Sequence, residues 1–148
     1  MRRFQFSLEK ILELRKHRER EAEIALGRAV GELSAVENRL KELALLRRGA
    51  WDEYRNHGVP AENLADYYRA REFYIRRLDQ TKEELLREAA EAQARVEEAR
   101  KVFLEASRER KVLDKLREKQ AGEYRKAVFS GEIKALDDMA GGRPLRDL

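Results

Sequence analysis

Charged residues make up 42% of the 148-residue chain and aromatic residues only 7%, and no apolar run approaches the ~20 residues of a membrane span. The 33 Lys and Arg against 29 Asp and Glu leave a net charge of +4, too balanced for a dedicated nucleic-acid binder. The absence of Cys excludes disulfides and thiolate zinc sites, two His disfavour a histidine metal site, and 8 Gly with 2 Pro disfavour a sheet-rich fold.

Helix-forming residues dominate the chain outside one short break, so we expect an all-α fold with a single coiled-coil domain over residues 1–148. The first helix is predicted over about 8–57. From Leu8, steps of three and four residues fall on apolar side chains at 11 of 14 positions, the spacing of a coiled-coil seam. This first stripe comprises Leu8, Leu12, Arg15, Glu19, Ala22, Leu26, Ala29, Leu33, Val36, Leu40, Leu43, Arg47, Ala50 and Tyr54.

The break is predicted at about 57–60, where Gly58 suits the residue that ends a helix and Pro60 suits the first turn of the next. The second helix is predicted over about 61–138, because the Gly pair at 141–142 indicates a helix end near residue 138. Residues 139–148 are predicted to form a flexible tail. Its stripe follows the same steps, with gaps at Arg71, Lys82, Arg110, Arg117 and Gln120. The apolar members are Leu64, Tyr68, Ile75, Leu78, Leu85, Ala89, Ala92, Val96, Ala99, Phe103, Ala106, Leu113, Tyr124 and Ala127.

A turn this short between two such stripes predicts a long antiparallel two-helix hairpin, with paired residues whose numbers add up to roughly 117. The second helix is the longer one, so its C-terminal part overhangs the first helix from about residue 117. The overhang still carries apolar side chains at helical spacing, and we expect a partner to cover them: Tyr124, Ala127, Phe129, Ile133, Leu136 and Met139.

The sequence contains no motif that indicates catalysis. It contains no Walker-type Gly-rich loop, no dinucleotide fingerprint and no Gly-x-Ser-x-Gly elbow. Its carboxylates alternate with Lys and Arg at i,i+4, which is typical of solvated helix faces. His17 and His57 are predicted to lie far apart as ordinary surface histidines. We therefore expect no catalytic residue, no cofactor and no metal ligand.

Charge is distributed unevenly along the predicted hairpin. Residues 1–20 carry seven Lys or Arg and three Glu, and residues 108–126 carry eight basic and four acidic residues. Both segments lie at the end of the hairpin opposite the turn, so this open end is basic. Such an end suits an acidic partner surface, because charge complementarity speeds association; chance clustering of solvated charges is the alternative interpretation.

The turn end is rich in aromatic residues. Of the eleven aromatics, six fall within residues 51–74: Trp51, Tyr54, Tyr67, Tyr68, Phe73 and Tyr74. Tyr54 and Tyr68 are seam positions, whereas Trp51, Phe73 and Tyr74 flank the seam. The flanking aromatics suit either a protein interface or the stapling of the two helices.

Three segments resemble the FliJ family, small coiled-coil proteins of the bacterial flagellar type III export apparatus. The first is FQFSLEKILELR at residues 4–15, similar to the family's Phe-x-Phe-x-Leu start before a Leu- and Arg-rich helix. The second combines EYR at 53–55 with YIRRL at 74–78, and the third combines LDKLREKQ at 113–120 with EYR at 123–125. The resemblance covers about residues 4–139.

The resemblance implies an antiparallel coiled coil similar to the central stalk of rotary ATP synthases. It implies a non-enzymatic, cytoplasmic protein that reaches the inner membrane's cytoplasmic face through the export apparatus, without membrane insertion or specific nucleic-acid binding. The implied partners are the hexameric export ATPase FliI, whose ring assembly and hydrolysis it promotes, the export gate protein FlhA, and export chaperones.

The resemblance also implies two partner-binding sites. By the stalk analogy the open end enters the ATPase ring, with the cations Arg15, Arg18, Lys111, Lys115, Arg117 and Lys119. The gate-binding surface near the turn maps onto Tyr54, Tyr74, Leu78, Thr81 and Leu85.

Other functions stay open at this point. A generic coiled-coil scaffold, or the stalk of a virulence type III secretion system, would have the same periodicity. A nucleic-acid binder is suggested by a sequence pI of about 9.4, but the basic residues are interleaved with Glu and no base-reading element follows them.

Overall fold

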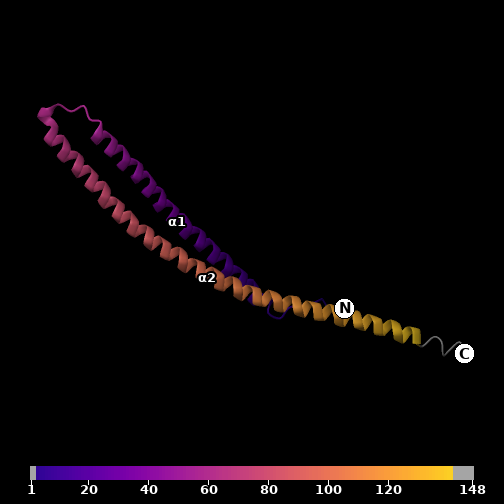
Figure 1. The fold of residues 1–148 in the computed structure, drawn as a ribbon. Helices are drawn as coiled ribbons and strands as arrows, with labels where there is room; N and C mark the ends of the chain where they lie inside the picture. The colour runs from indigo at the N-terminus through magenta and orange to yellow at the C-terminus, as the bar shows by residue number, and fades with distance from the viewer. Residues whose placement is uncertain (1–2, 142–148) are drawn as a thin grey trace. The chain divides into compact units, whose positions relative to one another are not determined.

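The structure is a computed structural model that describes residues 3–141, which form two long α-helices. Helix α1 spans Glu9–Arg55, helix α2 spans Leu64–Gly141, and a short 3-10 helix, η1, spans Ala61–Asn63 just before α2. Figure 1 shows α1 and α2 side by side and joined by the loop near η1. No strand occurs within residues 3–141. The expected all-α antiparallel hairpin is therefore confirmed.

The ends of the helices follow from local chemistry. Helix α1 has the acidic Glu9 in its first turn, near the positive end of the helix dipole. It has the basic Arg55 in its last turn, near the negative end. Pro60, at φ −58° and ψ 146°, is the N-cap residue of η1 and accepts a 3.0 Å hydrogen bond from the Asn63 N–H. No residue from 3 to 141 has a positive φ, so Gly58 does not end α1 in the left-handed conformation that its sequence position suggested.

Helix α2 differs from the expected boundaries at both ends. It begins at Leu64, because residues 61–63 form η1, and it continues through Gly141. Residues 139–141 are therefore helical, and the rest of the expected tail, 142–148, lies outside the described residues.

The chain packs as two compact units, which we describe one at a time. The turn unit contains residues 22–103, and the terminal unit contains residues 1–21 and 104–148, of which 3–21 and 104–141 are described. Both units contain parts of α1 and α2. All 14 positions of the first predicted stripe are buried or half-buried, so the periodicity identified the inner face of α1 along its whole length.

The turn unit holds the main apolar cluster of the seam. It consists of Val36, Leu43, Ala50, Ile75, Leu78 and Leu85, against which Leu40, Trp51 and Ala89 pack. Each buried Leu, Ile or Val side chain contributes about 1.5–3 kcal/mol relative to an exposed one, so this cluster dominates the stability of the unit.

The register of the hairpin differs from the sequence expectation. Arg47 pairs with Asp79 at 2.7 Å, whereas the expected register placed Arg47 opposite residue 70. In the terminal unit, Glu9 pairs with Arg117. The shift arises because the chain uses residues 56–66 in the loop, η1 and the first turn of α2 before Tyr67 and Tyr68 meet α1.

The shift shortens the overhang of α2. The Phe4 ring lies 5.6 Å from the ring of Tyr124, so the N-terminal segment covers α2 well past residue 117, where the overhang was expected to begin. Residues 129–141 are all exposed. The exposed overhang therefore begins close to residue 129.

Candidate partner-binding surfaces

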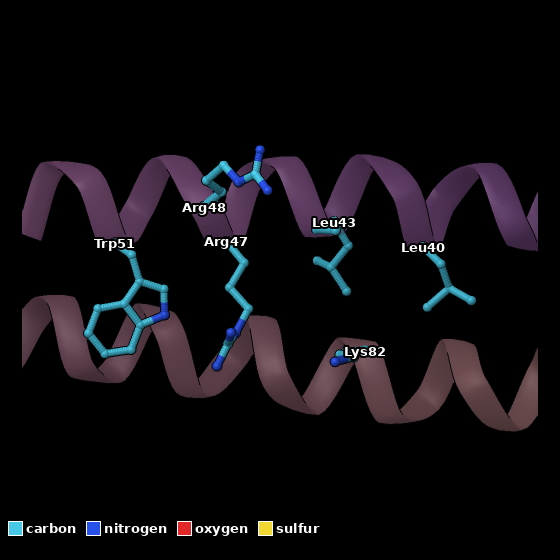
Figure 2. A pocket seen from close by; sticks show the side chains of 7 residues that line it. Leu40, Leu43, Arg47, Arg48, Trp51 and Lys82 are labelled. Atoms are coloured by element: carbon cyan, nitrogen blue, oxygen red, sulfur yellow. The ribbon is translucent and has the colours of Figure 1, made fainter.

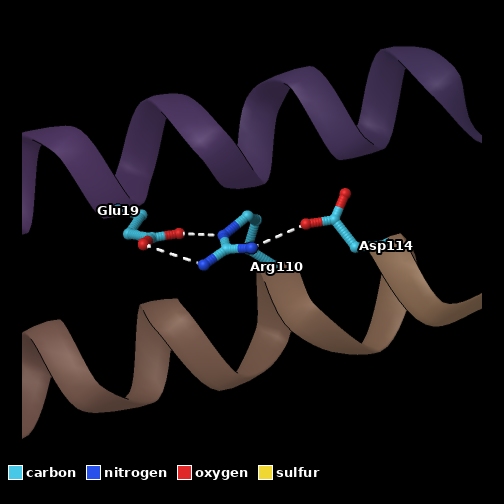
Figure 3. Close-up of polar contacts among 3 residues, drawn as sticks. All are labelled: Glu19, Arg110 and Asp114. Atoms are coloured by element: carbon cyan, nitrogen blue, oxygen red, sulfur yellow. Dashed lines mark hydrogen bonds and ion pairs between the residues drawn. The ribbon is translucent and has the colours of Figure 1, made fainter.

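The seam of the terminal unit is held by ion pairs as well as by apolar contacts. Arg110, at a gap in the apolar stripe of α2, donates hydrogen bonds from Nε and Nη2 to the Glu19 carboxylate, the second at 3.2 Å. Its Nη1 donates to Asp114 at 2.6 Å, as Figure 3 shows. The hydrogen bonds to Glu19, and then those to Asp114, raise the pKa of the Arg110 guanidinium. Arg110 is thus a fixed structural cation.

Two of the six cations expected to face the ATPase also serve this seam. Arg15 forms an ion pair with Glu109, and Arg117 forms one with Glu9 at 3.0 Å. Their side chains are half-exposed, so each pair contributes about 0–1 kcal/mol to stability. Part of their charge is already balanced within the molecule.

The other four expected cations are exposed: Arg18 on α1 and Lys111, Lys115 and Lys119 on α2. None of them forms an ion pair with another residue between 3 and 141. Successive members of the lysine trio are four residues apart, so the three side chains lie on one face of α2. Their charges are available to a partner.

The face that carries the three lysines continues along the overhang. Further steps of three and four residues lead through Gly122 to Lys126 and then to Phe129, Ile133, Leu136 and Ala140. Phe129 and Leu136 are 63% and 64% exposed, and Ile133 is 42% exposed. We call this set, Lys111 to Ala140, the basic-apolar stripe. Sequence reasoning found its two parts but not their continuity, although the same steps along α2 connect them.

At the turn, aromatic side chains pack on one another around the loop. The Tyr54 ring lies 5.1 Å from that of Tyr68 and 5.5 Å from that of Trp51. The His57 ring lies 4.9 Å from the Tyr67 ring, tilted by 50°, and its Nε2 lies 3.0 Å from the Tyr68 hydroxyl. His57 Nδ1 is buried without a hydrogen-bond partner among the described residues. The expected surface histidine is therefore part of a packed cluster that staples the turn.

A polar arrangement fixes the outer side of this cluster. The Tyr67 hydroxyl donates a 3.0 Å hydrogen bond to the Glu53 carbonyl oxygen. Arg71 pairs with the Glu53 carboxylate and lies 5.5 Å from the centre of the Tyr67 ring. The hydrogen bond to Tyr67, followed by the interaction with Glu53, raises the pKa of Arg71. Both contacts connect the last turn of α1 to the first turns of α2.

The five residues expected to contact the gate have different environments. Leu78 and Leu85 are each 8% exposed and belong to the apolar cluster, and Tyr54 belongs to the aromatic cluster. Tyr74 is 39% exposed, and Thr81 is exposed with its hydroxyl donating to the Arg77 carbonyl oxygen. Only Tyr74 and Thr81 of this set offer a surface to a partner.

Tyr74 shares its surface with apolar residues that sequence reasoning missed. It lines a shallow groove with Leu45 and Leu46, which are 67% and 56% exposed. These leucines lie outside the first stripe, and adjacent apolar residues off the seam were the available signal. Phe73, also off the seam, is 64% exposed, whereas Trp51 packs against the apolar cluster.

A comparison with protein-family models decides the identity of the family. The model described as flagellar FliJ protein matches residues 4–147, nearly the whole chain. The chain belongs to the flagellar FliJ family. Comparisons with curated proteins and with solved structures gave no match.

Membership of the FliJ family makes this chain a component of the bacterial flagellar export apparatus. The two-helix hairpin with its apolar seam is the fold that the resemblance implied. Within residues 3–141, no group of His, Cys, Asp and Glu side chains is arranged to hold a metal ion. Neither helix in that range has a segment long and apolar enough to cross a membrane.

Proposed function

We propose that this FliJ-family protein is a non-enzymatic stalk that binds the flagellar export ATPase, promotes assembly of its ring and stimulates its hydrolysis. The observation that carries the proposal is the basic-apolar stripe, a face of α2 that is exposed except at the half-buried Gly122 and that changes from four lysines to large apolar side chains. Buried apolar area supplies most of the free energy of association, and charge supplies orientation and rate.

The two parts of the stripe would act in different ways. The positive charges of Lys111, Lys115 and Lys119 attract the acidic surface of a ring opening. This attraction acts over distances of about 8–10 Å, the Debye length at ordinary salt concentration. Phe129, Ile133 and Leu136 then supply the apolar contact, because their side chains are largely exposed in the chain alone. Arg15 and Arg117 support this surface by holding the two helices together, and Arg18 adds an exposed charge on α1.

The turn unit would bind the export gate protein. Tyr74 and Thr81 contact the partner together with the exposed Leu45 and Leu46. Leu78, Leu85 and Tyr54 act from inside by holding α2 against α1, which fixes the direction of the Tyr74 ring. A protein that binds the ring at one unit and the gate at the other links the two, and it remains available to export chaperones.

ATP hydrolysis by the purified export ATPase, measured with and without this protein, tests the proposal. We expect stimulation by the native chain, together with more hexameric rings in particle images. The combined substitutions Lys111→Glu, Lys115→Glu and Lys119→Glu should remove most of the stimulation. A matched control reverses Arg87, Arg100 and Lys101 to Glu; all three are exposed in the turn unit and form no ion pair with residues 3–141.

Two outcomes would contradict the proposal. One is stimulation that persists in the Lys111, Lys115 and Lys119 variant while its helix content by circular dichroism equals that of the native chain. The other is an equal loss in the control variant, which would mean that net charge, and not the stripe, determines the effect.

A further inference from the structure

A second groove crosses the seam of the turn unit, on the edge opposite to Tyr74. It has a volume of about 240 Å³ and is lined mainly by one face of α1, with one residue from α2. Figure 2 shows its principal side chains, which are Leu40, Leu43, Arg47, Arg48, Trp51 and Lys82. None of these belongs to either partner-binding site implied by the family resemblance.

The floor of the groove is apolar. Leu40, Leu43 and Trp51 extend from α1 toward α2, as Figure 2 shows. Leu43 is part of the apolar cluster of the turn unit, and Leu40 and Trp51 are half-buried against that cluster. Because the cluster beneath holds these side chains in place, the floor is formed before any partner arrives.

The charged side chains that line the groove are all cationic. Arg47 extends across it from α1 toward α2, between Leu43 and Trp51, whereas Arg48 and Lys82 form its rim, and no carboxylate lines it. The Arg47 charge is balanced by Asp79 at 2.7 Å. Arg48 and Lys82 form no ion pair with any residue between 3 and 141, and both are exposed. Two cations that lack a counter-charge therefore border an apolar surface, one from each helix.

We propose that this groove binds an acidic segment of a partner protein, which packs one bulky apolar side chain on the floor that Leu40, Leu43 and Trp51 form. Carboxylates on either side of that side chain pair with Arg48 and Lys82. The cationic rim selects an acidic segment by charge complementarity, and the apolar floor requires an apolar residue within it.

The size of the groove favours a protein segment over a small molecule. Small-molecule pockets have volumes of about 300–1,000 Å³ and enclose most of the ligand, whereas this groove is smaller and open along the helices. A space of this size suits one or two side chains of a peptide that continues beyond it. The proposal goes beyond the stalk function and does not depend on it, because its test contains no ATPase.

Trp51 is the only tryptophan of the chain, so its fluorescence reports directly on the groove. The probes are three alanine-based helical peptides of equal length. One has a central Leu flanked by Glu, the second has the same Leu flanked by Lys, and the third has a central Ala flanked by Glu. Inorganic phosphate and ATP serve as small-anion probes.

We expect a saturable change in Trp51 emission with the Glu-flanked Leu peptide and a much smaller response to the other probes. The double variant with Arg48→Glu and Lys82→Glu should bind that peptide at least about tenfold more weakly. Leu40→Ala should also weaken binding, since it removes part of the floor. The matched control with Arg87→Glu and Lys101→Glu should bind like the native chain.

Several results would overturn the proposal. The first is no response to the Glu-flanked Leu peptide at millimolar concentration, and the second is an equal response to the Lys-flanked or Ala-centred peptide. An equal response to phosphate or ATP would make the groove a small-anion site. Equal weakening in the Arg87 and Lys101 control would show that net charge alone governs binding.

Discussion

At the scale of single residues, Arg110 shows how a polar side chain can occupy a coiled-coil seam. It lies at a gap in the apolar stripe of α2, where its side chain is only 25% exposed and its guanidinium bonds to Glu19 and Asp114. Glu19, itself a seam residue, is 18% exposed in its side chain. A seam that contains such a pair gains specificity of register, since any shift would separate the partners.

Arg110→Ala should destabilise the protein by about 1–2 kcal/mol, because the half-buried Glu19 side chain would lose the hydrogen bonds and the counter-charge that Arg110 supplies. Replacing Arg110 and Glu19 together by Leu should be neutral or stabilising, since neither charge is then left behind. Urea unfolding followed by circular dichroism measures both effects. Arg108→Ala, at an exposed position, is the control and should change the free energy of unfolding by less than about 0.5 kcal/mol. A loss as large in the double variant as in Arg110→Ala would contradict this account.

At the scale of elements, α2 has two faces with different tasks. Its seam face packs against α1, and its basic-apolar stripe lies on another face. Within the described residues, Phe129, Ile133 and Leu136 of this stripe are exposed and do not pack against α1. Substitutions at these three positions therefore remove no packing between α1 and α2. Exposed apolar side chains that do not contribute to the packing of the hairpin are typical of a binding surface.

Changing Phe129, Ile133 and Leu136 together to Ser should leave the unfolding midpoint of the hairpin nearly unchanged, within about 0.5 kcal/mol. If the stalk proposal holds, the same variant should stimulate the export ATPase several-fold less than the native chain. Unfolding by urea and ATP hydrolysis, measured on the same preparation, separate the two effects. Ile24→Ser, exposed in the turn unit, provides the matched control. A strong loss of stability in the triple variant would instead place these side chains in a packed seam.

At the scale of the whole molecule, each unit combines ion pairs with apolar packing, but in different proportions. The turn unit has a continuous apolar cluster, and its ion pairs between α1 and α2, at Arg39, Arg47, Arg71 and Arg95, add to that cluster. In the terminal unit, the ion pairs at Arg15, Arg110 and Arg117 accompany fewer buried apolar side chains, those of Phe6 and Leu12 among the described residues. Salt screens such pairs, whereas it does not weaken the burial of apolar surface.

Raising the salt concentration from about 50 to 500 mM should therefore speed amide hydrogen exchange in the α1 residues of the terminal unit, 9–21. Residues 36–50 of the turn unit should exchange at the same rate or more slowly. Hydrogen exchange with mass spectrometry resolves both segments in one experiment. Uniform acceleration along α1 would show that the ion pairs do not distinguish the two units.

The sequence by itself determined the fold class and the buried face of each helix. Apolar residues at steps of three and four mark the side of a helix that leaves water, and every position from Leu8 to Tyr54 in that stripe is buried or half-buried. The motifs at residues 4–15, 53–55, 74–78, 113–120 and 123–125 also indicated the family that the whole-chain match then established.

Only the tertiary structure decided the register and the accessibility of the candidate residues. Periodicity does not specify how many residues a loop uses before two helices meet, so Arg47 was expected to pair about nine residues too early on α2. Composition also does not determine which cations pair with a carboxylate on the other helix. Arg15 and Arg117 form such ion pairs, whereas Lys111, Lys115 and Lys119 form none with the residues from 3 to 141. The physical reason is that burial of a face is encoded locally along one helix, whereas register and ion pairing depend on the position of the other.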